Sequence, residues 1–562
     1  MKSIKDIDLS PKPGKEYWMN CHREWREEFI YFLLVDRFHD NKKRQSMEFE
    51  VRHSGFGEEK QLGKSCGGTI RGITDHLDYI KELGCTAIWL SPVFKNNPES
   101  YHGYAIENYL EIDPRFGTKE DMEKLVETAH GYNMSVFLDI VLHHSGDNWC
   151  YPDDLEYFYY KGFRFPFGGW RYEDEPAPVE LRDPELYGRK GQIRNFDSYP
   201  ETREGDFYGL KAFKNDESAE AIYVQKILAD IHCYWIRELD IDGFRLDAVK
   251  HMGELSISRF CSAIREYAYS LGKENFFLFG EVVGADEMYS RYIGAKTLST
   301  YHDQNIYYGL NSVLDFQLYF TLEGVIKGAD SPEKLIDRYK QLQKSALDRG
   351  EYGEFLVTFL DNHDQVGSDI KHRYGYNAEP AQIIAGIAFL LCALGTPCIY
   401  YGTEQGLDGH GKGDTHIREC LFNPGDKTTN LLNQHSSIYE AIAELAKFRS
   451  TNNVLKFGRM FMREISNDGI NFHLPDCNKC TLAFSRILAG EEIVFVYNSS
   501  AEETKEEHIL VDCEVNRNRQ WMRPVYGHGI DVEIRQSPDP SNPVRYIRLD
   551  LKPMQLVILK NY

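Results

Sequence analysis

Short apolar segments alternate with amphipathic segments from about residue 28 to residue 450. The apolar segments lack the polar alternation of a half-exposed strand, as expected for parallel strands that are covered on both faces. Their spacing leaves room for a helix between most neighbours. Eight strands are predicted on this pattern, at residues 29–35, 87–92, 135–142, 243–247, 276–280, 312–318, 355–360 and 395–401.

The segments between these strands have the periodicity of amphipathic helices. Residues 119–130 place four apolar side chains on one face, and Thr118 and Asp121 form a capping pair at the start. Another helix is predicted from Ser331, with Pro332 at its first position. Eight such alternations predict an α/β fold, a (β/α)8 TIM barrel with insertions. A doubly wound open sheet has the same periodicity and stays as the alternative.

Two stretches interrupt this rhythm. About 70 residues rich in Gly, Pro, Tyr and Arg follow the third strand, which is too long for a plain loop. They predict an inserted domain over residues 145–217. Short alternating strands separated by turn-forming residues predict a C-terminal antiparallel β-sandwich domain over residues 455–562. The barrel is assigned residues 1–144 and 218–454.

The charge of the chain argues against two classes of binding partner. The 65 Lys and Arg against 87 Asp and Glu give a net charge of −22, which argues against nucleic acid and against an anionic membrane surface. The N-terminus has no apolar run of the kind that export signals contain, and no stretch is long enough to span a membrane. We therefore expect a cytoplasmic protein; the sequence leaves the oligomeric state open.

The 12 cysteines are scattered along the chain. In a reducing cytoplasm most of them are expected to be free thiols. Cys477 and Cys480 have the CxxC spacing, but no second pair accompanies them. We interpret this pair as part of a hairpin turn in preference to a zinc site.

Charged side chains gather where the predicted strands end. In a barrel, functional groups lie at the carboxyl ends of the strands. On the fourth strand Arg245 and Asp247 are two residues apart and therefore share a face. A single aspartate in such a place is commonly a helix cap, but four charged strand ends on one rim predict a site for binding or chemistry. The segments are residues 139–144 (DIVLHH), 243–247 (GFRLD), 279–281 (FGE) and 361–364 (DNHD).

Two carboxylates across a pocket suit glycoside hydrolysis, in which one attacks the anomeric carbon and the other protonates the leaving oxygen. We expect Arg245 to hold Asp247 ionised through a charge-assisted hydrogen bond. Glu281 stands between apolar neighbours, so desolvation is expected to raise its pKa, as a general acid requires.

The same segments resemble the conserved regions of the α-amylase family of glycoside hydrolases. The resemblance runs from about residue 26 to the C-terminus, and four motifs occur in the family's order. The matching segments are residues 139–144, 243–251 (GFRLDAVKH), 279–282 (FGEV) and 359–364 (FLDNHD), with 101–104 (YHGY) and 395–404 (GTPCIYYGTE) beside them.

The resemblance implies a role for each residue of the rim. Asp247 would be the nucleophile, Glu281 the general acid/base and Asp364 the third carboxylate, which grips sugar hydroxyls. Arg245 would orient the nucleophile, and Tyr104 would stack on the sugar ring. His144 and His363 would bind hydroxyl groups, with His102 and Asp139 assisting. The family retains anomeric configuration, so the two reacting carboxyl groups should lie about 5–5.5 Å apart.

Lys250 and His251, directly after the nucleophile, resemble the pair that lines the leaving-group side in enzymes acting on α-1,4 glucans. The resemblance therefore favours hydrolysis of α-1,4 bonds in maltodextrins or glycogen-derived oligosaccharides. The insertion at residues 41–65 would lie over the active face.

The chain departs from the family pattern at the common structural calcium. His143 stands where the family usually has an asparagine ligand, and residues 209–214 lack the expected aspartate, with Ala212 or Lys214 in its place. A histidine nitrogen is a poor ligand for Ca²⁺. The common calcium is therefore predicted to be absent, and no cofactor is required for the chemistry; calcium near Asp36 and Asp40 stays open.

The sequence leaves three other functions to compare with hydrolysis. A transglycosylase, including sucrose- or trehalose-acting enzymes, would keep the mechanism and deliver the glycosyl group to a sugar. A catalytically silent carbohydrate-binding protein would usually lack one of the three carboxylates, and all three are present. An unrelated barrel enzyme such as an aldolase finds no lysine on a strand end for a Schiff base.

Overall fold

The computed structural model describes residues 1–19, 23–47, 63–153, 163–299, 304–349, 355–366, 368–425, 428–527, 529–538 and 543–562. Eight parallel strands form one sheet in the order β15-β12-β11-β6-β3-β1-β18-β16. A parallel bridge between Leu314 and Val357 joins its two edges, so the sheet closes into a barrel and the open-sheet alternative is wrong. The strands are β1 (Ile30–Leu33), β3 (Ala87–Leu90), β6 (Ser135–Ile140), β11 (Gly243–Leu246), β12 (Phe277–Gly280), β15 (Ser312–Val313), β16 (Val357–Thr358) and β18 (Thr396–Tyr400).

The sixth strand is much shorter than the predicted segment 312–318. The Asp315 carboxylate accepts a hydrogen bond from the Leu318 N–H at 3.1 Å and caps a helix there. Helix α10 therefore begins at Phe316, inside the predicted strand. The apolar run had no periodicity that could separate a buried strand from the start of a buried helix.

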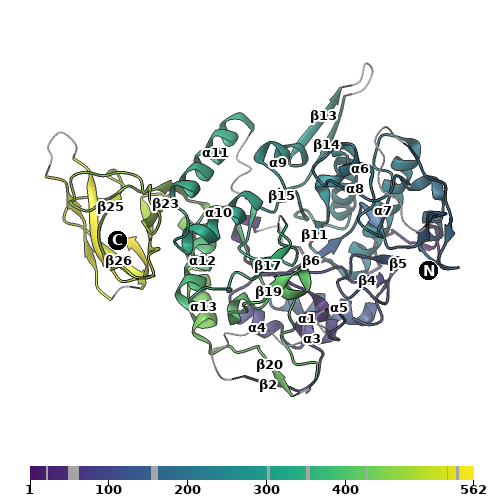
Figure 1. Cartoon of the computed structure of the whole chain (residues 1–562), viewed down its shortest axis with the longest axis horizontal. Helices are drawn as coiled ribbons and strands as arrows, with labels where there is room; N and C mark the ends of the chain where they lie inside the picture. Colours follow the sequence, from purple (N-terminus) through teal and green to yellow (C-terminus); the bar gives the residue numbers. More distant parts are fainter. Residues whose placement is uncertain are drawn as a thin grey trace.

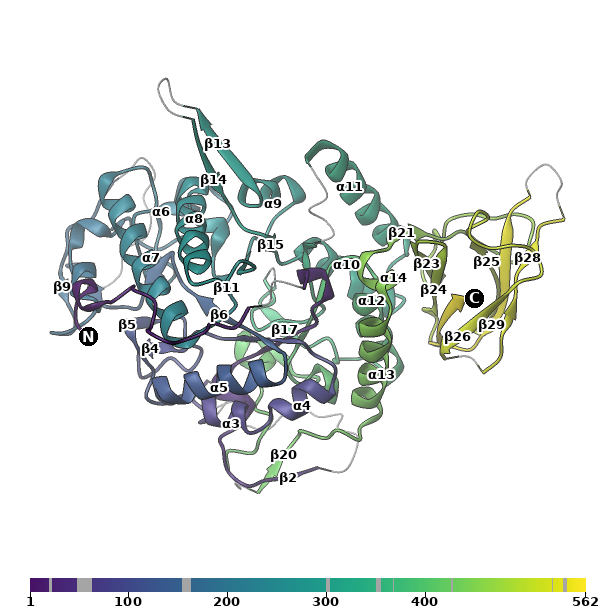
Figure 2. The same ribbon diagram turned by 180° about the vertical axis from the view of Figure 1, so that it is seen from behind.

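Helices surround the barrel and connect its strands (Figures 1 and 2). The predicted helix at 119–130 is α5, and Thr118 and Asp121 form the expected capping box. The helices are α3 (Ile70–Thr74), α4 (Leu77–Glu82), α5 (Lys119–Gly131), α7 (Ala219–Leu239), α8 (Glu254–Ser270), α9 (Asp286–Tyr292), α10 (Phe316–Ile326), α11 (Glu333–Arg349), α12 (Pro380–Cys392) and α13 (Ser437–Thr451).

The long stretch after β6 contains short elements packed beside the barrel. Three two-residue strands, the short helix α6 (Glu201–Glu204) and β10 (Lys211–Ala212) occur in it. Strand β10 pairs with β7 (His144–Ser145), which directly follows the third barrel strand. The insertion is thereby held against the carboxyl end of the barrel.

Two antiparallel sheets form the C-terminal lobe, which is drawn in yellow in Figure 1. Apolar residues from both sheets, Val494 and Ile547 among them, make one core between the sheets, as in a β-sandwich. Phe389 of α12 packs edge-on against Phe484 at 5.3 Å and anchors the lobe to the barrel. The larger sheet contains β21 (Arg459–Met462), β23 (Thr481–Leu488), β24 (Glu491–Asn498), β30 (Leu556–Asn561), β26 (Trp521–Tyr526) and β27 (Val532–Glu533); the smaller contains β22 (Ile465–Ser466), β25 (Lys505–Val511), β29 (Arg545–Leu551) and β28 (Arg535–Gln536).

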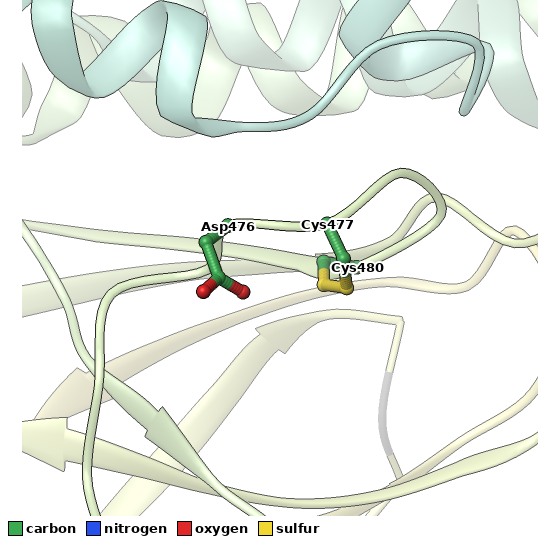
Figure 3. Close-up of side chains that lie close together, drawn as sticks. All are labelled: Asp476, Cys477 and Cys480. Atoms are coloured by element: carbon green, nitrogen blue, oxygen red, sulfur yellow. A yellow bond between two sulfur atoms is a disulfide. The ribbon is translucent and has the colours of Figure 1, made fainter.

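Seven of the described cysteines are free thiols, as expected for most of them. Two disulfides depart from that expectation. Cys66 is paired with Cys420, and Cys477 is paired with Cys480 in the turn before β23 (Figure 3). Among the described residues, no helix is both long enough and apolar enough to cross a bilayer.

Candidate active site

A cavity of about 1030 Å³ opens at the carboxyl ends of the barrel strands. Eight of the predicted site residues line it. Arg245, Asp139 and His363 lie directly behind its wall, where they contact the lining residues. The predicted lining residues are His102, Tyr104, His144, Asp247, Lys250, His251, Glu281 and Asp364.

The Arg245 guanidinium is the centre of this arrangement. It is almost fully buried and contacts three carboxylates at once. Its Nη1 donates to Asp139 Oδ1 at 2.9 Å and to Asp247 Oδ1 at 2.8 Å, and its Nη2 donates to Glu281 Oε2 at 2.7 Å. One cation therefore orients both carboxylates that were predicted to react.

The backbone after β11 brings Glu281 to Asp247. Ala248 has a φ of 51°, in the left-handed region that a side chain other than glycine rarely adopts. In this conformation the Ala248 N–H donates to Glu281 Oε2 at 3.3 Å. Strained backbone of this kind is typical of functional sites.

Burial raises the pKa of Glu281 to about 7, although the Arg245 charge opposes the shift. This agrees with the prediction from its apolar neighbours. Burial also raises the pKa of Asp247 to about 7. The charge-assisted bond expected from Arg245 is present and opposes this shift, but the same cation also serves Asp139 and Glu281. Two adjacent carboxyl groups that titrate near neutrality can hold one proton between them, as acid and nucleophile require.

Asp364 has a different environment. Burial alone would raise its pKa, but the neighbouring His363 ring and the Arg418 guanidinium hold that pKa well below its usual range. Arg418 Nη2 donates to Asp364 Oδ1, and Arg418 Nε donates to the His363 carbonyl at 2.7 Å. The third carboxylate is therefore ionised across the neutral range.

Arg418 was missed by the sequence analysis. It follows β18 in a segment of short turns, remote in the chain from Asp364, and no strand-end position marks it. The only local signal was an arginine in a charged run, which more often indicates a solvated face.

Aromatic rings form the wall beside Asp364. The Tyr104 hydroxyl donates to Asp139 Oδ2 at 2.8 Å, and the ring stacks on His363 at 5.3 Å and on His102 at 5.6 Å. Burial lowers the pKa of His102 and His363 to about 3 and that of His144 to about 4. These imidazoles are therefore neutral near pH 7 and can exchange hydrogen bonds with neutral hydroxyl groups.

Lys250 and His251 lie on the side where the insertion closes the cavity. Lys250 Nζ forms an ion pair with Asp197, and His251 Nδ1 lies 2.6 Å from the Thr202 carbonyl. Phe196, Phe207 and Tyr208 from the insertion also line the cavity. The sequence does not distinguish these three residues, because the insertion contains many aromatic residues with no periodicity.

Comparison with known proteins agrees with this geometry. A family model described as the catalytic domain of alpha-amylase matches residues 32–423. The chain belongs to the α-amylase family. This assignment confirms the predicted family and the barrel fold.

Individual relatives cover much of the chain. An α-amylase of Streptomyces lividans is 28% identical over 86% of this chain and 56% of its own length. A cyclomaltodextrin glucanotransferase of Klebsiella oxytoca is 30% identical over 68% of this chain and 58% of its own. The chain thus spans under three fifths of these curated relatives. The crystal structure of an α-amylase from Geobacillus thermoleovorans, complexed with acarbose, matches with a TM-score of 0.68 at 25% identity and covers 96% of this chain and 99% of its own.

The position of the family's common calcium does not suit that ion here. His143 is fully buried, and burial holds its pKa well below 6.5. Its Nδ1 lies 3.3 Å from His144 Nδ1. Nearby, the cation of Lys211 lies 3.0 Å from Asp147. A neutral imidazole and an ammonium are the wrong groups for a hard cation that requires oxygen ligands.

The other places considered for a metal are occupied by protein groups. The Asp36 carboxylate accepts hydrogen bonds from Ser65, Cys66 and Gly67, and Asp40 binds Lys42 and Arg44. Within the described ranges, Asp476, Cys477 and Cys480 are the one group with ligand-like spacing, but their sulfurs form a disulfide (Figure 3). The absence of calcium stays a prediction. Of the predicted insertion at 41–65, residues 48–62 lie outside the described residues.

Proposed function

We propose that this protein is a retaining glycoside hydrolase that cleaves α-1,4-glucosidic bonds in maltodextrins or glycogen-derived oligosaccharides. The observation that supports this most strongly is the Arg245 guanidinium, which binds Asp247 and Glu281 together at a cavity that also exposes Asp364. A neutral substrate fits the acidic chain and the neutral imidazoles of the wall.

The reaction has two steps. The ionised Asp247 carboxylate attacks the anomeric carbon while Glu281 donates its proton to the leaving glycosidic oxygen. The product of this step is a glycosyl ester on Asp247. Glu281, now ionised, removes a proton from water as the water oxygen attacks the same carbon, and Asp247 leaves.

The remaining residues bind and orient the sugar. Asp364 is held ionised and accepts hydrogen bonds from two adjacent hydroxyl groups as the ring flattens. Tyr104 provides the stacking face, and His102, His144 and His363 bind further hydroxyl groups. Asp139 fixes Tyr104 and Arg245 in place, since it accepts from both. Lys250 and His251 face the departing sugar.

Replacement of the nucleophile tests the proposal. Asp247→Asn should reduce maltoheptaose hydrolysis by on the order of 10⁴-fold with little change in fold, measured by reducing-sugar release and circular dichroism. Asp337→Asn serves as a matched control, since Asp337 is an exposed aspartate of α11 that does not line the cavity. Full activity of Asp247→Asn would overturn the assignment.

Transfer to a sugar acceptor is the second candidate. Tyr208 has a φ of 55°, is 72% exposed and lines the leaving side of the cavity, where an acceptor sugar could stack on it. Chromatography of maltotriose digests separates the two: longer or rearranged products with little reducing-end release indicate transfer, and glucose and maltose indicate hydrolysis.

A further inference from the structure

A second hollow lies on the opposite side of the barrel from the active site. It is a groove of about 700 Å³ lined by α8, by the segment before β12 and by the base of strand β14 (Gln304–Tyr308). Residues 273–276 directly precede β12, and Asn311 directly precedes β15. The groove is therefore at the amino ends of the strands, whereas the reacting carboxylates are at the carboxyl ends.

Two tyrosine rings stand at this groove without a packing role. Tyr269 is 67% exposed and Tyr308 is 54% exposed. Within the described part of the chain, neither ring stacks on another ring, and neither hydroxyl forms a hydrogen bond. The buried Phe276 adds an apolar surface to the same groove. Exposed aromatic faces supply stacking surface to a ligand at low entropic cost, since a tyrosine loses few rotamers.

Some polar groups of the groove are hydrogen-bonded within the protein, and others form no ion pair. Arg265 Nη1 donates to the Tyr308 carbonyl at 3.1 Å, and its Nη2 donates to Asn311 Oδ1 at 2.9 Å. Asn311 Oδ1 also accepts from the Leu278 N–H at 3.0 Å, so its amide is fixed with the Nδ2 donor directed away from these bonds. Glu266 and Glu274 form no ion pair with any described residue.

The charges exclude an anionic ligand. Lys273 Nζ is buried and already binds Asp240 and Asp242, and Arg265 is committed to the two acceptors named above. What the groove offers is two ring faces, two carboxylate acceptors and one fixed amide donor. A neutral polyhydroxylated chain can use all of them, since sugar rings stack on aromatic faces and hydroxyl groups both donate and accept.

We propose that this groove, with Tyr269 and Tyr308 as stacking platforms, is a second binding site for polymeric α-glucan that holds the polymer away from the catalytic cavity. The ligand class rests on the proposed function of the cavity. A polymer bound here raises the local concentration of chain ends and segments for the same enzyme. Short oligosaccharides cannot reach both sites, so only polymers gain from it.

Affinity electrophoresis in glycogen gels tests the site in the Glu281→Gln background, in which the general acid is lost and the gel is not digested. Tyr269→Ala with Tyr308→Ala should weaken the apparent affinity for glycogen by about tenfold. In the otherwise wild-type enzyme the same pair should leave kcat/KM on maltoheptaose within about twofold, because both rings lie outside the cavity. Tyr223→Ala is the matched control, since Tyr223 is 43% exposed on α7 and does not line the groove.

The outcomes separate the two proposals. Unchanged retardation of the double variant overturns the second site, whatever the activity of the enzyme. If retardation depends on the two tyrosines but the wild-type enzyme does not hydrolyse maltoheptaose, the groove remains a glucan-binding site and the proposed hydrolytic function is wrong. A concentration-dependent dimer in sedimentation velocity that the double variant abolishes would assign the groove to a second copy of the chain, and would also overturn the proposal.

Discussion

The two ends of the catalytic cavity show opposite uses of one residue type. At one end Arg245 is shared by Asp139, Asp247 and Glu281, and burial raises the pKa of Asp247 and Glu281 to about 7. At the other end Arg418 binds Asp364 and also lies 3.4 Å from Asp414, and the pKa of Asp364 stays well below its usual range. Burial raises the pKa of the carboxyl groups at both ends, and the cations beside each group decide how far that rise is offset.

This contrast matches the chemistry that each end is proposed to perform. A group that must protonate a leaving oxygen and then take a proton from water needs a pKa near the working pH. A group that only grips hydroxyls is most useful when it stays ionised. Ordinary aspartate and glutamate side chains can perform both tasks, because the placement of the two arginines makes their pKa values differ.

Arg245→Leu breaks the shared end and should have the largest effect. Three buried carboxylates would lose their common cation, so Asp247 would be less ionised and badly oriented. We expect kcat/KM on maltoheptaose to fall by roughly 10³-fold or more, measured by initial rates. Arg245→Lys should recover only a small part, because an ammonium cannot match the planar fork. Activity near wild type in Arg245→Leu would contradict the shared-cation account.

Arg418→Leu removes the cation beside Asp364 and should cost less activity than Arg245→Leu. The pKa of Asp364 would rise and its orientation would loosen, so sugar binding in the transition state would weaken by about 10–100-fold in kcat/KM. The pH at which activity falls on the acid side should also move upward, which a merely structural loss would not produce. An unchanged pH profile would assign Arg418 to packing alone.

The pH profile of the wild-type enzyme tests the difference in pKa between the two ends of the cavity without any substitution. Glu281 acts when protonated, so activity is lost as the pH rises through its raised pKa of about 7. Asp247 acts when ionised, so activity is lost as the pH falls. We expect a narrow bell in kcat/KM on maltotriose, measured between pH 4 and 9, with no separate limb from Asp364. A plateau in kcat/KM that extends to pH 9 would contradict the role of Glu281 as a general acid with a pKa of about 7, because that group is ionised at such a pH.

Sequence reasoning reached most of this architecture because its signals are local. Apolar runs and strand-end charges located Asp247, Glu281 and Asp364, and the GFRLDAVKH motif added Lys250 and His251. The length of the sixth strand was missed because a buried run does not distinguish a strand from a helix start. Arg418 and the shared state of Arg245 were missed for another reason: they depend on which loops meet in space, and no spacing in the chain records that.

The most direct test of the account is to trap the glycosyl-enzyme. The Glu281→Gln variant is incubated with a fluorinated α-glucosyl fluoride, whose good leaving group needs no acid and whose intermediate hydrolyses slowly; peptide mass spectrometry then locates the label. The account predicts a glycosyl ester on Asp247. A label on Asp364 or Asp139, or reaction with inversion and no labelled peptide, would contradict it.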